Sequence, residues 1–311
     1  MKKKHIKLAG NILTVLAFIF IVKRLYEMDI DYSVLLSQSN IWWLTLFCIL
    51  YGIHIMALPV SWQQIIQIIT KNKVPFPDVE KVFCKSNIMK YIPGNVFQYV
   101  GRNEIAVQFD FSHRVILTTT LLDIIANIFG VTIVSLTCYA RGIKIGIDSI
   151  RVKITPSLIF LPAVVFLFFL FLVYWKRKII LEKILIFCTL ANIRRYLFCI
   201  VYYMFFAVYT GIIYLLVLTQ ILDMSIANDK IYIVIGAYLL SWLLGFIMPG
   251  APGGIGIRET VITVLLAAYL PSDSVLLAIV IYRIVSIAGD FFAFIMSLLI
   301  DCNIKKYNKN S

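Results

Sequence analysis

Residues 231–260 read IYIVIGAYLLSWLLGFIMPGAPGGIGIRET, and this stretch combines the two features that decide the fold. Its first 18 residues carry no charged side chain, which is typical of a membrane helix, because about 20 apolar residues span the hydrocarbon core of a bilayer. Two Pro-Gly pairs then stop the helix before a second apolar block begins. We therefore expect a membrane helix followed by a break at membrane depth.

The rest of the chain is similarly apolar. Of its 311 residues, 61% are hydrophobic and 14% are charged, whereas a soluble domain has about 25% charged residues. This composition excludes a water-soluble enzyme. Because none of the apolar blocks alternates as barrel strands do, the sequence predicts an all-α integral membrane protein with about seven or eight transmembrane helices in one polytopic domain. The expected spans lie at residues 8–22, 41–60, 115–140, 157–175, 196–222, 231–248, 255–270 and 274–300.

The charge distribution predicts the orientation of the chain. With the N-terminus in the cytoplasm, 20 of the 29 Lys and Arg residues fall in cytoplasmic segments, as the positive-inside rule requires. We interpret the net charge of +13 as an orientation signal in the cell membrane and expect no nucleic-acid partner. The six cysteines are dispersed without a CxxC pair, so we expect no disulfide framework, no metal site and no cofactor.

Two stretches interrupt the apolar pattern, because they are too polar to span a membrane and too apolar to be ordinary loops. The first includes Pro93-Gly94 and the second includes Pro249-Gly250. Non-helical backbone at membrane depth is tolerated where protein or water covers it. We therefore predict re-entrant segments near residues 83–104 and 249–270.

The two stretches share a spacing. Arg102 follows its Pro-Gly pair at the same interval at which Arg258 follows the other pair, with an offset of 156 residues. Broken apolar segments at matching places are typical of transporters built from two repeats. Pro-Gly pairs are also ordinary helix breakers, and both interpretations stay open. If the repeat is real, the halves are about 1–155 and 156–311.

The second stretch has the chemistry of an anion site. Glycines at 253, 254 and 256 let backbone amides turn toward one point, and a helix that starts nearby adds a partial positive charge and Arg258. A guanidinium offers two parallel donors to a phosphate or carboxylate. The alternative is an interfacial turn at which Arg258 and Glu259 extend toward water. The predicted substrate-binding residues here are Gly253, Gly254, Gly256, Arg258 and Glu259.

The first stretch places charged side chains around a Pro-Gly break, with aromatic residues between them. A charged group beside apolar walls suits a lipid headgroup. The alternative is an amphipathic helix on the cytoplasmic face, where lysines meet anionic lipid without specificity. The predicted substrate-binding residues are Lys90, Pro93, Gly94, Arg102 and Glu104.

Three further charged residues lie inside apolar blocks: Asp123, Arg283 and Asp290. Each costs about 2.5–3.5 kcal/mol at mid-membrane, so each should face the bundle or water. Arg283 and Asp290 are seven residues apart and can share one helix face. We hypothesise that the three residues line a pathway. The alternative is that internal ion pairs use these charges to fix the packing.

At these two motifs the chain resembles the lysylphosphatidylglycerol synthase transmembrane-region family, whose members are also described as flippase-like proteins. The resemblance rests on Lys90–Gly94, Tyr99–Arg102 and Pro252–Glu259. It implies a bundle with re-entrant helices, which in the bacterial multiple peptide resistance factor moves aminoacylated phosphatidylglycerol to the outer leaflet. A soluble domain makes that lipid in the full-length proteins. Only residues 303–311 follow the last expected span, so we expect no aminoacyl transfer here.

The sequence and the resemblance together predict a flippase-like protein that moves an anionic headgroup between leaflets. The expected partner is a phospholipid or a polyprenyl-linked or glycolipid headgroup, and a second copy of the chain or a separate soluble synthase are candidate protein partners. No enzyme signature such as HExxH or GxSxG occurs. A membrane-embedded transferase acting on a lipid-linked substrate and a non-catalytic accessory subunit remain as alternatives.

Overall fold

The structure is a computed structural model that describes residues 37–92, 96–107, 112–146, 189–247, 254 and 256–310. Every regular element in these ranges is helical, which confirms the predicted all-α class. The elements are α3 (Gln38–Ala57), α4 (Pro59–Thr70), α5 (Phe76–Asn87), the 3-10 helix η1 (Ile88–Tyr91), α6 (Phe97–Ala106), α7 (His113–Gly146), α10 (Leu190–Leu216), the π-helical turn η4 (Val217–Ile221), α11 (Ile231–Ile247), α12 (Ile257–Leu266) and α13 (Ser272–Asn310).

Long apolar helices make this a multi-pass membrane architecture. In the described ranges, four helices are long and apolar enough to cross a membrane: Gln38–Thr70, His113–Arg141, Leu190–Ile221 and Ser272–Ile300. The shorter α11 is also apolar. The expected spans at 8–22 and 157–175 lie outside the described residues, and the total of seven or eight spans stays a prediction.

The block 255–270 does not form a full span. Its helix α12 has 10 residues. At 1.5 Å per residue its length is about 15 Å, half the thickness of a hydrocarbon core. This short helix therefore fits the predicted broken segment better than an eighth span.

A proline divides the first described span into two helices. Pro59 cannot donate a hydrogen bond, so α4 begins with it, although Leu58 keeps helical backbone angles and its N–H still donates to the carbonyl of His54 at 3.1 Å. In the first turn of α4, Ser61 donates a hydrogen bond to Asp123 of α7 and Trp62 donates one to Thr119 of α7. Both side chains are almost completely buried there.

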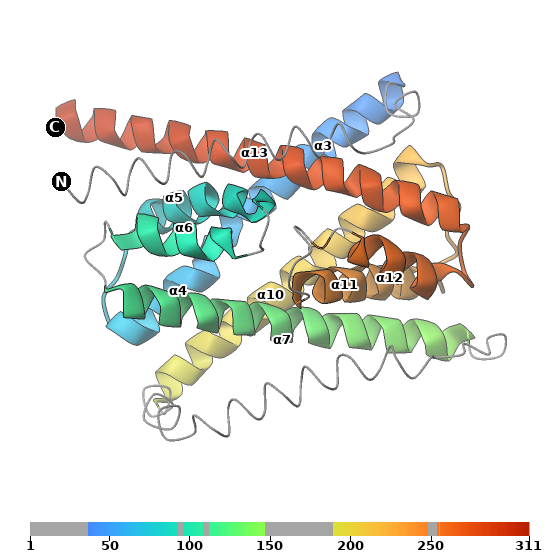
Figure 1. The fold of residues 1–311 in the computed structure, drawn as a ribbon, viewed down its shortest axis with the longest axis horizontal. Helices are drawn as coiled ribbons and strands as arrows, with labels where there is room; N and C mark the ends of the chain where they lie inside the picture. The colour runs from blue at the N-terminus through green and yellow to red at the C-terminus, as the bar shows by residue number, and fades with distance from the viewer. Residues whose placement is uncertain are drawn as a thin grey trace.

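In the described ranges, the two halves of the chain share part of their order of helices. In each half a pair of helices surrounds a motif, α5–α6 or α11–α12, and a long helix follows, α7 or α13. The helices α6 and α12 both have 10 residues. In Figure 1, α13 (red) and α7 (green) run along opposite sides of the molecule, and the two helix pairs lie between them at opposite ends.

Each long helix packs against elements of the other half. The helices α3 and α5 contact α13, whereas α10 and α11 contact α7. Glycines allow close crossings in both places. A Cβ atom at Gly289 of α13 would lie 2.9 Å from the Cys48 carbonyl of α3, and one at Gly130 of α7 would lie 2.9 Å from the Ile200 carbonyl of α10. The motif-bearing helices are thus held between the two halves.

Aromatic side chains fill the centre of the bundle. The rings of Tyr214 and Tyr238 stack with centroids 4.9 Å apart, and the ring of Tyr282 meets Tyr238 at 5.0 Å and Tyr51 at 6.0 Å. These four tyrosines come from α10, α11, α13 and α3. The outward faces of the long helices expose large apolar side chains such as Trp42, as expected for a surface that lipid covers.

Candidate functional site

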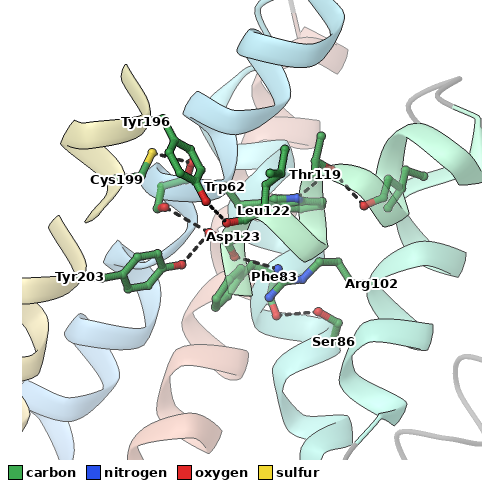
Figure 2. A network of polar contacts seen from close by, with 12 residues as sticks. Trp62, Phe83, Ser86, Arg102, Thr119, Leu122, Asp123, Tyr196, Cys199 and Tyr203 are labelled. Carbon is green, nitrogen blue, oxygen red and sulfur yellow. Dashed lines mark hydrogen bonds and ion pairs between the residues drawn. The ribbon is translucent and has the colours of Figure 1, made fainter. Parts of the chain in front are cut away.

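A buried ion pair joins α6 to α7 (Figure 2). The Arg102 Nη1 atom lies 3.1 Å from Oδ2 of Asp123, and the two residues are only 5% and 4% exposed. The guanidinium carbon of Arg102 also lies 4.3 Å from the centroid of the Phe83 ring and 4.9 Å from that of Trp62. Arg102 is therefore enclosed by its carboxylate and by aromatic rings.

Two hydroxyl groups complete the environment of Asp123. Its Oδ1 atom accepts hydrogen bonds from Ser61 at 3.1 Å and from Tyr203 at 2.6 Å. Figure 2 shows Tyr203 reaching this carboxylate from α10, on the side opposite Arg102. A buried carboxylate with these three donors is satisfied without a ligand. The pair fixes α4, α6, α7 and α10 to one another, which is the packing role left open as the alternative for Asp123.

A second ion pair joins η1 to α13. The Lys90 Nζ atom lies 2.6 Å from Oδ2 of Asp290. Asn87 donates to the other carboxylate oxygen at 2.7 Å, and the Tyr91 hydroxyl also donates to Asp290. The two partners differ in their access to solvent, because the Lys90 side chain is 22% exposed and that of Asp290 is 1% exposed.

A third ion pair joins α12 to α13. The Arg283 Nη2 atom lies 2.9 Å from Oε1 of Glu259 and donates to the Gly254 carbonyl at 3.2 Å. Glu259 also accepts a hydrogen bond from the backbone N–H of Gly256 at 2.8 Å, so it caps the start of α12. Glu259 thus has two structural contacts in addition to its predicted role in binding a ligand.

Arg258 differs from the other three cations. In the described part of the chain, no carboxylate forms an ion pair with it. Its buried Nε atom has no acceptor, which is also true of the Nε atom of Arg102. Its guanidinium carbon lies 5.7 Å from the centroid of the Trp242 ring. The charge of Arg258 also acts on four tyrosines of α3, η1, α11 and α13, namely Tyr51, Tyr91, Tyr238 and Tyr282.

Glycines give the Arg258 side chain its space. A Cβ atom at Gly245 would lie 2.6 Å from the Arg258 Cγ atom, and one at Gly254 would lie 2.8 Å from its Nε atom. Gly254 also has a φ of 72°, which a residue with a side chain rarely adopts. Gly256 has a φ of 81°, but a Cβ atom there would meet nothing within 4 Å. Only the first two glycines are therefore required by the space around Arg258.

One face of α13 brings the polar groups of both motifs together. Arg283, Asp290 and Ser297 follow one another at intervals of seven residues and bind Glu259, Lys90 and Glu80, respectively. The prediction that Arg283 and Asp290 share a face therefore agrees with the structure. The ion pairs that they form are with the two motifs.

The sequence analysis did not single out Glu80, Asn87 or Ser297. Glu80 is 3% exposed, and its carboxylate accepts hydrogen bonds from Ser297 at 3.0 Å and Cys84 at 3.3 Å. Burial raises the pKa of Glu80, which lies on α5 outside the candidate spans, while these two hydrogen bonds lower it. The available signal was the spacing of seven residues, which separates Glu80 from Asn87 as well as the three residues of α13.

The remaining predicted residues divide into two groups. Pro93, Gly94 and Gly253 lie outside the described residues. Glu104 is half-buried on α6, away from any ion pair in the described part of the chain. Lys90, Gly254, Gly256, Arg258, Glu259, Arg283 and Asp290 lie along α13 or beside it, whereas Arg102 and Asp123 form their own closed pair.

No family model matches the chain, and no curated protein has a similar sequence. A proposal about function is therefore argued from the geometry of the site.

Proposed function

We propose that the chain binds an anionic phospholipid or lipid-linked headgroup and moves it between the two leaflets of a membrane. The observation that carries this proposal is Arg258, a cation of the second motif that pairs with no carboxylate in the described residues and lies 5.7 Å from the centroid of the Trp242 ring. The resemblance of both motifs to flippase-like proteins points in the same direction.

The pairing of the charges beside α13 favours an anion at Arg258. In the described ranges Lys90 pairs with Asp290 and Arg283 with Glu259, and the third carboxylate beside α13, that of Glu80, accepts hydrogen bonds from Ser297 and Cys84. No carboxylate in these ranges forms an ion pair with Arg258. A partly buried charge is costly unless it is paired, and a phosphate oxygen supplies both the opposite charge and the acceptor that the Arg258 Nε atom lacks.

Lys90 is the second phosphate partner in this proposal. Its side chain is 22% exposed, so a headgroup can reach it. The sequence analysis expected Arg102 to take such a role. The proposed site does not include Arg102, because Asp123 and two aromatic rings enclose its guanidinium.

The arrangement of the helices supports movement of the headgroup between leaflets. Transporters often place their substrate between two repeats, next to helices that are broken at membrane depth. Here the helix pairs α5–α6 and α11–α12 each contain a break and each contact the long helix of the other half. We propose that the two halves are such repeats and that both breaks are re-entrant.

Reconstitution tests the proposal. We expect the purified chain to bring fluorescent phosphatidylglycerol from the inner to the outer leaflet of vesicles, where dithionite quenches it. Arg258→Ala should weaken lipid binding by about 10- to 100-fold, which is the loss of one charge-assisted contact.

The matched control is Arg114→Ala, which removes a charge of the same sign from the exposed start of α7. This variant should behave as the wild type does. If wild-type vesicles show neither lipid binding nor leaflet transfer, the proposed function is wrong. A transferase would instead convert the lipid without moving it.

A further inference from the structure

Lys90 has two competing partners if the proposed function is correct. It now binds the carboxylate of Asp290 at 2.6 Å, and the same ammonium group is a phosphate partner in the proposed site. The ammonium is partly exposed and can turn toward a headgroup, whereas Asp290 is buried on α13 and cannot follow it. A headgroup that takes Lys90 therefore leaves Asp290 behind without its cation.

We propose that Asp290 takes up one proton when an anionic headgroup binds Lys90, so that lipid binding and proton uptake are coupled one to one. This inference rests on the proposed function and adds the ion that would drive it. The proton comes from water and bonds to the carboxylate oxygen that Lys90 releases. No other bond forms or breaks, and the phosphodiester keeps its single negative charge.

The physical reason is the cost of a buried charge. Asp290 is 1% exposed, and without Lys90 it keeps only neutral donors, Asn87 and Tyr91. Removing one partner of a buried ion pair is strongly destabilising as long as the other partner stays charged. Protonation removes this cost. It also leaves the net charge of the site unchanged, because one negative charge and one proton enter together.

The other titratable groups around Asp290 do not replace Lys90. Tyr91 on η1 donates to the carboxylate, and Cys84 on α5 and Tyr51 on α3 are close enough to feel its charge. In the described ranges Lys90 is the only cation that contacts Asp290. Arg283, two turns away on α13, is held by Glu259.

The pair between Arg102 and Asp123 shows why this exchange is specific to Lys90. Both partners of that pair are buried, and Asp123 also accepts two hydroxyl hydrogen bonds. No headgroup can reach Arg102 without first separating the helices. The Lys90–Asp290 pair differs from it, because the cation is partly exposed while the carboxylate is buried.

The test measures protons and lipid together. Dioctanoyl phosphatidylglycerol is added to the purified protein in weakly buffered detergent with a pH indicator, and bound lipid is measured by calorimetry. We expect the uptake of about one proton per bound lipid, and a dissociation constant that rises about tenfold for each pH unit through the neutral range, as the linkage of one proton requires.

Asp290→Asn should bind the lipid with no proton uptake and without this pH dependence, because its amide resembles the protonated carboxyl group. Glu80→Gln is the matched control, since Glu80 is a carboxylate of α5 buried against the same face of α13, and no lysine in the described ranges forms an ion pair with it. This variant should still take up one proton per lipid.

A measurement on the wild type keeps the proposal testable if Asp290→Asn does not fold. Infrared difference spectra should gain the carbonyl band of a protonated carboxyl group when the lipid is added. If the lipid binds and neither proton uptake nor this band appears, the coupling is wrong and the proposed function stands. If the wild type binds no lipid, the proposed function fails and the coupling fails with it.

Discussion

Replacing Arg102 with alanine should destabilise the protein strongly, because the variant leaves Asp123 charged and buried. The substitution removes the 3.1 Å ion pair and the contacts of the guanidinium with the rings of Phe83 and Trp62. Asp123 would keep only its two hydroxyl donors, Ser61 and Tyr203. Breaking a buried pair from one side costs about 3–5 kcal/mol. We therefore expect the melting temperature in detergent to fall by roughly 10 °C.

The double variant Arg102→Met with Asp123→Asn separates the buried charge from the other losses. It leaves no charge in the site, and the asparagine can still accept hydrogen bonds from the two hydroxyls. We expect it to melt at a higher temperature than Arg102→Met alone, and a double-mutant cycle with the single variants Arg102→Met and Asp123→Asn would register a coupling energy between the two positions. The assay is loss of the monodisperse peak in size-exclusion chromatography after heating. A wild-type melting temperature for Arg102→Ala would refute the structural role and return Arg102 to the ligand role predicted from the sequence.

Substitutions around the second motif should have graded effects. Gly254→Ala should abolish leaflet transfer, because its methyl group would meet Arg258 and the backbone at a positive φ. Gly256→Ala should cost only the backbone strain, about 1–3 kcal/mol in thermal or chemical denaturation, because the space beside it is open. Glu259→Gln should lower the melting temperature by removing the charge that holds Arg283, and a wild-type melting curve would show that this pair adds no stability.

Hydropathy was enough to predict the helical class and the four long spans of the described ranges. The reason is that a helix forms all of its backbone hydrogen bonds internally, as a segment in lipid must. It also located both breaks, because Pro-Gly pairs are local signals. The lengths of α6 and α12 could not be predicted in the same way, since they depend on where each helix meets its neighbours. The end of α12 at Leu266, before the apolar block ends, illustrates this limit.

The partners of the buried charges could not be predicted from the sequence. Spacing along one helix placed Arg283 and Asp290 on the same face, but each takes a partner from a different motif. Lys90 and Asp290 are 200 residues apart in the chain, and only the packing of α5 against α13 brings them together. Long-range ion pairs follow from tertiary structure, whereas a single sequence reports mainly on local structure.

The three ion pairs differ in which parts of the molecule they join, and this difference suggests how binding could become movement. Arg102 with Asp123 and Glu259 with Arg283 each connect a short helix to the long helix that follows it in the same half. Lys90 with Asp290 connects the first half to the long helix of the second half. It is also the pair whose cation is most exposed to solvent. A headgroup that draws Lys90 away would thus weaken a contact between the halves while the contacts within each half persist. In a transporter that moves one repeat against the other, this is one of the contacts between the halves that must open.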